Sequence, residues 1–145
     1  MESKGGFYIT QIKQISDRIF DKILQQNDIT LTGGQGRILY ILWKQDNLTM
    51  SALSQQTSLA KNTLTVVIDG MVKRGLVSRV QNPENRREII ISLTEYSKNL
   101  REKYELVSSQ MNNIYYHNFS LEEQQQFETY LLKILNNLIK AENEV

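Results

Sequence analysis

The chain has 145 residues, a formal net charge of +1 and no cysteine, and 40% of its residues are hydrophobic. This length allows a single domain, 1–145, with a buried core, and the lack of cysteine excludes disulfides and zinc sites with cysteine ligands. The sequence contains neither a secretion signal nor an apolar run of about 18 residues, so we expect a cytoplasmic protein that does not cross a membrane.

The charge is unevenly distributed along the chain. Residues 61–87 contain six basic and two acidic side chains, whereas residues 120–145 contain two basic and five acidic ones. A basic stretch in a nearly neutral chain is typical of a DNA-contacting surface. A solvated protein face would produce the same pattern, so charge alone leaves both interpretations open.

Two helices are predicted at the start of the chain. Isoleucines at helical spacing predict the first helix over residues 7–26. Thr32 begins the second helix, and Gln35, three residues later, completes a capping box. A polar turn is expected at residues 44–47.

Two shorter helices follow. Residues 48–49 are expected to be extended, and Thr49 is the predicted N-cap of a third helix over residues 50–56. After a short turn, a fourth helix is predicted over residues 61–74. Gly75 ends this helix because glycine readily adopts a positive φ.

The next segment predicts a β-hairpin. Residues 77–80 favour a strand, and residues 89–93 form the strongest β-branched run of the chain. Between them, residues 81–87 are expected to form a polar loop with the only proline of the chain and two arginines. Two helices followed by a hairpin with a basic loop indicate a winged helix-turn-helix, which we assign to residues 31–93.

The remaining sequence is helical. Apolar residues at alternating steps of four and three predict a long helix over residues 94–117, and Ser120 with Glu123 forms a capping box that begins a last helix. The predicted fold is therefore mainly α: a winged lobe of three short helices and a β-hairpin wing, with terminal helices around it. We assign residues 7–26 and 95–142 to homodimerisation because their apolar stripes need a partner, the alternative being a helical cap within the monomer.

The fourth helix is the predicted DNA-reading element, because the major groove admits one α-helix. Asn62 can pair with adenine, and the methyl groups of Thr65 and Val66 can contact thymine methyl groups. The predicted major-groove residues are Lys61, Asn62, Thr63, Thr65 and Val66. Contacts with the DNA backbone are expected from Thr49, Ser51, Lys73, Arg74 and Arg79. Contacts with the minor groove are expected from the wing residues Asn85, Arg86 and Arg87.

A set of short motifs runs through this region. It consists of Leu31-Thr32, Gln35, Leu39, Leu53, Thr63-Leu64-Thr65, Ile68-Asp69, Arg74-Gly75-Leu76-Val77, Arg79, Asn85-Arg86-Arg87 and Ser92-Leu93-Thr94. This set resembles the MarR family of winged helix-turn-helix regulators, and the flanking helices extend the resemblance over nearly the whole chain. The resemblance implies a homodimer that represses transcription from a palindromic operator and releases the DNA when a small aromatic or phenolic effector binds. It also implies that Arg86 is the minor-groove arginine of the wing.

The chain departs from the family pattern at two positions. Asn85 stands where an acidic residue commonly precedes the wing arginine, which removes an anchor for the Arg86 guanidinium. Ala60 stands where a serine or threonine usually caps the recognition helix, which forgoes about 1 kcal/mol unless Ser58 replaces it.

Other side chains give no indication of catalysis. One histidine, His117, without cysteine makes a metal site unfavourable, and Gly33–Gly36 lacks the lysine that follows in a P-loop. We expect Trp43 to be a core residue and the pair Tyr115-Tyr116 to be packing or surface residues, and we expect no enzyme, cofactor or metal. A winged-helix protein-interaction module without specific DNA binding is the alternative function.

Overall fold

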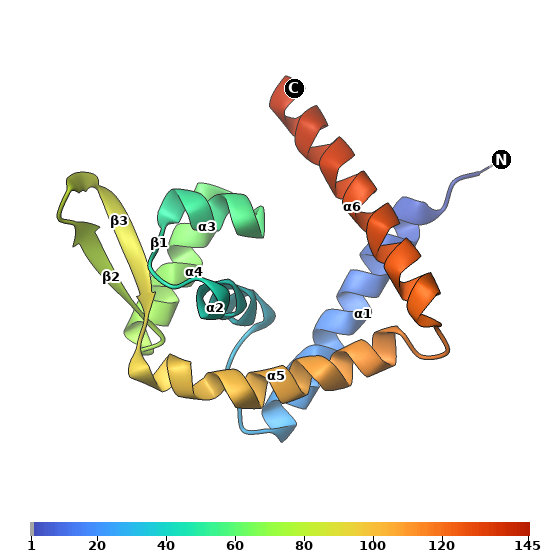
Figure 1. Ribbon diagram of the computed structural model, residues 1–145, viewed down its shortest axis with the longest axis horizontal. Coiled ribbons are helices and arrows are strands. Elements are labelled where there is room, and N and C mark those ends of the chain that lie inside the picture. The colour runs from blue at the N-terminus through green and yellow to red at the C-terminus, as the bar shows by residue number, and fades with distance from the viewer. Residues whose placement is uncertain (1) are drawn as a thin grey trace. The chain divides into compact units, whose positions relative to one another are not determined.

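A computed structural model describes residues 2–145, which form six α-helices and one three-stranded antiparallel sheet (Figure 1). The chain divides into two compact units, the first ending at Ser108 and the second beginning at Ser109, and each is described by itself. The predicted mainly helical winged fold is confirmed. Within the described residues, no helix is long and apolar enough to span a bilayer.

The helices of the first unit lie within two residues of their predicted bounds. A capping box begins the second of them, because the Thr32 hydroxyl accepts from the Gln35 amide at 3.3 Å while Gln35 Oε1 accepts from the Thr32 amide at 3.2 Å. The helices are α1 (Gly5–Gln26), α2 (Gly33–Lys44), α3 (Met50–Thr57), α4 (Lys61–Lys73) and the first part of α5 (Glu95–Tyr115).

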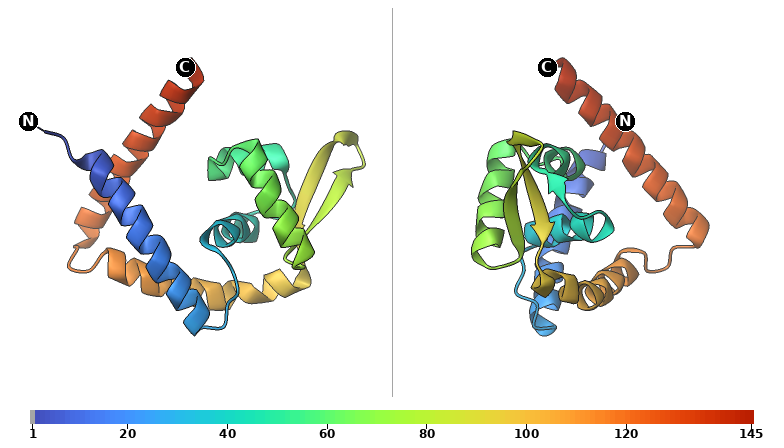
Figure 2. Two further views of the ribbon diagram at one scale, coloured as in Figure 1. Left: turned by 180° about the vertical axis from the view of Figure 1, so that it is seen from behind. Right: turned by 60° about the vertical axis from the view of Figure 1, so that its left-hand side comes forward.

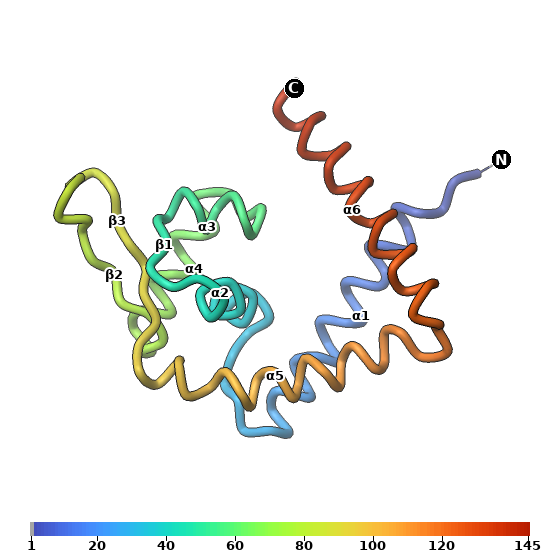
Figure 3. Tube along the Cα trace, in the orientation of Figure 1, coloured from blue at the N-terminus to red at the C-terminus, as the bar shows by residue number. Residues whose placement is uncertain are grey.

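The sheet consists of β1 (Leu48–Thr49), β2 (Val77–Asn82) and β3 (Asn85–Leu93) in the order β1-β3-β2. Strands β2 and β3 form a hairpin that extends beyond helices α3 and α4 as a wing (Figures 2 and 3). The predicted short extended segment at residues 48–49 is confirmed, since it pairs with β3 through Leu48 and Ile91.

The predicted polar loop over residues 81–87 is wrong, because most of this segment belongs to the strands. Pairing passes from Gln81–Ile89 to Asn82–Asn85 across a register shift, so residues 86–88 bulge out of the ladder. The turn itself is short because Asn82 Oδ1 accepts from the Glu84 amide at 3.0 Å. Arg86 and Arg87 therefore lie on β3 rather than in a flexible loop.

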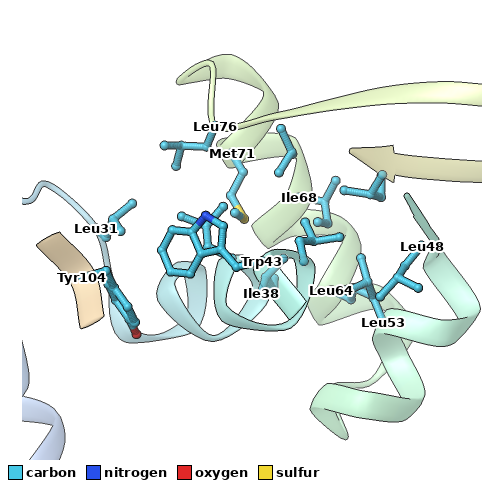
Figure 4. Packing of buried hydrophobic residues seen from close by; sticks show 14 of the residues in the cluster. Leu31, Ile38, Trp43, Leu48, Leu53, Leu64, Ile68, Met71, Leu76 and Tyr104 are labelled. Atoms are coloured by element: carbon cyan, nitrogen blue, oxygen red, sulfur yellow. The ribbon is translucent and has the colours of Figure 1, made fainter. Parts of the chain in front are cut away.

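The core of the first unit lies between α2, α3, α4 and the sheet. Ile38, Leu53, Leu64 and Ile68 are fully buried, and each contributes about 1.5–3 kcal/mol to folding (Figure 4). Trp43 is also buried, which confirms the packing role predicted for it.

Hydrogen bonds fix the end of α4 to the start of α5. Gly75 has a φ of 71° and turns the chain directly after α4. The Thr94 hydroxyl donates to the Gly75 carbonyl at 2.7 Å, and the buried Ser97 hydroxyl donates to the Leu76 carbonyl at 2.6 Å. The indole of Trp43 donates to the Ser97 carbonyl at 2.9 Å, which connects α2 to the same point.

The second unit contains the end of α5 and helix α6 (Leu121–Glu144). The predicted capping box of Ser120 and Glu123 is confirmed by reciprocal bonds of 2.9 and 3.1 Å. Tyr116 packs against Phe127 and donates its hydroxyl to Glu128 at 2.6 Å. No side chain of α6 is buried.

Candidate nucleic-acid interface

Helices α3 and α4 form the helix-turn-helix of the lobe. Thr49 caps α3 as predicted, because its hydroxyl accepts from the Ala52 amide at 3.1 Å. Ser58 has a left-handed φ of 60° and reverses the chain after α3. The Ser54 hydroxyl then donates to the Leu59 carbonyl at 2.8 Å, which holds the turn in front of α4.

Helix α4 is amphipathic. Its core face, which includes Leu64, Ile68 and Met71, is buried in the lobe. Val66, on the other side, is 71% exposed. All five predicted major-groove residues are exposed on this helix: Lys61, Asn62, Thr63, Thr65 and Val66.

The amino terminus of α4 has no side-chain cap. Its N-cap residue, Ala60, offers no oxygen, and Ser58 does not replace it because Ser58 is the C-cap of α3. The first amides of α4 therefore retain hydrogen-bonding capacity toward solvent or an anion.

A hollow of about 350 Å³ separates α4 from the wing. Three cationic side chains, Lys61, Arg79 and Arg87, line it, together with Glu88. Its remaining lining residues are Thr49, Met50, Ser51, Leu64, Thr65 and Ile89. The fold thus gathers residues of the predicted major-groove, backbone and wing sets around one concave surface.

The two wing arginines occupy different environments. Arg87 lines the hollow, and its amide donates to Asn85 Oδ1 at 3.1 Å. Arg86 is exposed and is not part of the lining; its carbonyl accepts from the Gln81 side chain at 3.3 Å. Sequence reasoning could not separate them, because the bulge of β3 determines which arginine is directed toward α4.

The residues predicted to contact the DNA backbone differ in their partners. Arg79 forms an ion pair with Asp69 of α4. Arg74 donates to the Thr30 carbonyl and, at 3.0 Å, to Gln35 Oε1, so its guanidinium connects the end of α4 to the start of α2. Lys73 is exposed and forms no ion pair within residues 2–145.

The three-stranded sheet, the helix-turn-helix and the wing define a winged helix-turn-helix protein. Residues 31–89 match the model of the MarR family. The organic hydroperoxide resistance transcriptional regulator of Bacillus subtilis is 35% identical over 75 residues, which cover 52% of this chain and 51% of that protein. The multiple antibiotic resistance protein MarR of Escherichia coli is 27% identical over 131 residues, which cover 90% of each chain.

Solved structures agree with this assignment. A mutant MarR from Escherichia coli complexed with operator DNA is 25% identical, with a TM-score of 0.80 over 90% of this chain and 92% of that one. The family model, these relatives and these structures all support a winged-helix protein of the MarR family. The chain spans about half the length of the first curated relative that it matches. Within residues 2–145 there is no cluster of three or more histidine, aspartate and glutamate side chains that can hold a metal ion.

Proposed function

We propose that this protein is a transcriptional regulator that binds a specific operator in double-stranded DNA. The observation that carries the proposal is the exposed face of α4 beside the cations Lys61 and Arg87. An α-helix fits the major groove, and lysine and arginine neutralise the neighbouring phosphates. Similarity to a MarR protein solved with operator DNA supports this proposal.

We propose further that the protein acts as a homodimer on a palindromic operator. In α1, Phe7 is 68% exposed and Ile12 is 47% exposed. In α6, Leu132 is 56% exposed and Leu138 is 62% exposed. An isologous contact would remove such side chains from water and would place two copies of α4 about one DNA turn apart, roughly 34 Å.

A dimer bound across a promoter would exclude the polymerase, so we propose repression, in the cytoplasm and without catalysis. A small aromatic or phenolic effector would release the DNA. The hollow between α4 and the wing supports this mechanism, because a ligand bound beside Lys61 and Arg87 would compete with the DNA phosphates for these two cations.

The test is selection of bound duplexes from genomic fragments at low salt, followed by affinity measurements over a range of salt concentrations. We expect an inverted-repeat site and a logarithmic salt slope of about 0.9 for each phosphate contact. Light scattering should give the mass of two chains. A monomer would contradict the dimer, and the absence of any selected duplex would contradict the regulator.

The wing and the alternative function are tested in the same assay. Arg86→Ala and Arg87→Ala, measured separately, identify which arginine contributes to binding at the flanks of the site. A protein-interaction module would bind an acidic protein partner that specific duplex DNA does not displace.

A further inference from the structure

Val66 has an unusual place for an aliphatic side chain. It is 71% exposed, more than Val80 at 54% or any other large hydrophobic side chain within residues 31–93. It lies in the middle of α4, on the side away from the buried Leu64 and Ile68. Nothing in the lobe requires an apolar group here, because folding leaves this side chain in water.

The surface of α4 beside Val66 carries no large side chain at position 70. Gly70 lies one helical turn further along α4, and a Cβ added there would meet no atom within 4 Å. The Thr65 hydroxyl donates to the Lys61 carbonyl at 2.9 Å, so its hydrogen is used inside the helix. The groups that α4 presents around Val66 are therefore small and partly apolar.

Helix α4 also lacks the side chain that most often reads guanine. It contains no arginine, and its two lysines occupy its first and last positions, Lys61 and Lys73. Arg74, the next residue, is bound to Thr30 and Gln35 instead. Bidentate recognition of guanine by a guanidinium from the middle of this helix is thus impossible.

We propose that Val66 reads thymine through its C5-methyl group, an inference that rests on the proposed operator binding. The thymine methyl is the apolar group that the four bases offer in the major groove. Contact between it and the valine methyl groups removes apolar surface of both from water. Asn62, one turn before Val66 on the same face of α4, can pair with adenine, so the proposal places a second A·T pair in the half-site.

Deoxyuridine provides the test, because it differs from thymidine only by the missing methyl group. Each thymine of the selected operator is replaced in turn, symmetrically in both half-sites. Affinity is then measured for the wild type, Val66→Ala and the matched control Val80→Ala, an exposed valine of β2. We expect one position to weaken wild-type binding about fourfold per half-site, which is about 0.8 kcal/mol for one buried carbon group.

Val66→Ala should bind the thymine operator several-fold more weakly and should no longer distinguish thymine from uracil at that position. Val80→Ala should distinguish them as the wild type does. Thymine reading would be overturned if Val66→Ala still distinguished thymine from uracil as the wild type does, or if uracil at no position weakened wild-type binding. Either result would leave the proposed operator binding intact. Failure to bind any duplex would overturn the proposed function and the reading by Val66 with it.

Discussion

Gly36 of α2 lies directly against Tyr104 of α5. A Cβ added to Gly36 would lie 2.5 Å from the Tyr104 hydroxyl oxygen and 2.8 Å from a ring carbon. The tyrosine ring cannot move aside easily, because it packs between Phe20, at a centroid distance of 5.8 Å, and Trp43, at 5.1 Å. Helices α2 and α5 are so close at this point that only glycine fits at position 36 without a clash.

Gly36→Ala should therefore destabilise the protein by about 1–3 kcal/mol through overpacking. Urea denaturation measures the change. Gly34→Ala is the matched control, since no atom lies within 4 Å of a Cβ at that position of the same helix. Equal stability of the two variants would show that Tyr104 yields without cost.

The pH dependence of stability should also report on Tyr104. Burial raises its pKa to about 12 from an ordinary value of 10.0. The unfolded chain then ionises first, so this stabilising contribution is complete below pH 10, falls between about pH 10 and 12, and is lost above that range. Urea denaturation across this interval measures it, and Tyr104→Phe should make the fall shallower.

Tyr116 provides the control for this measurement. Desolvation, and after it the hydrogen bond to Glu128, raises the pKa of Tyr116 to about 12 as well. Tyr116→Phe allows its contribution to be subtracted. An identical fall in Tyr104→Phe and the wild type would show that Tyr104 ionises equally in the folded and unfolded chains.

A serine at the start of α4 should supply the missing cap. Ala60→Ser is expected to raise the free energy of unfolding by about 1 kcal/mol, because Ala60 already has the extended backbone of an N-cap, with φ −62° and ψ 149°. Ser120→Ala, which removes a cap that is present, should lower it by about the same amount. Thermal unfolding should show a higher melting temperature for Ala60→Ser and a lower one for Ser120→Ala. A lower melting temperature for Ala60→Ser would contradict the capping argument.

Arg74 and Lys73 are neighbours with different expected roles. Arg74→Ala should lower stability by about 1 kcal/mol, because it removes hydrogen bonds to Thr30 and Gln35 at an exposed site. It should leave the salt slope of DNA binding unchanged. Lys73→Ala should reduce that slope by about 0.9 with little effect on stability. A smaller salt slope for Arg74→Ala, with no change in its stability, would instead support the contact between Arg74 and the DNA backbone that the sequence predicted.

Gly70→Ala should separate folding from binding. Alanine is favoured over glycine inside a helix by about 1 kcal/mol, and this chain leaves the space for its methyl group empty. We expect a higher melting temperature together with weaker operator binding, because the added methyl group would intrude on the DNA beside Val66. Tighter binding would indicate that α4 meets DNA on another side.

The helices could be predicted closely because their signals are local. The capping boxes at Thr32 and Ser120 and the glycine after α4 lie within a few residues of the boundaries that they specify. The wing was harder, because asparagine and proline favour turns by composition. There, Asn82 and Asn85 instead pair with each other and lengthen both strands.

The partners of the arginines could not be predicted from neighbouring residues. The acceptors of Arg74 lie 39 and 44 residues away in the sequence, and they meet it only when α2 packs beside α4. The position of Arg87 in the hollow depends in the same way on the bulge of β3. Tertiary packing, rather than residue type, decides which cations remain available to a ligand.

Helix α6 has 24 residues and buries no side chain within the single chain. Its aromatic contacts with the preceding segment are made by Phe127, which packs against Tyr116 and Phe119. Helices with few tertiary contacts are only marginally stable in water, so association in the proposed dimer would supply much of the stability of α6. The melting temperature would then rise with protein concentration by mass action. A higher cellular concentration of the protein would raise the number of chains and also the fraction of them that is dimeric and folded. Operator occupancy would therefore rise more steeply than in proportion to expression.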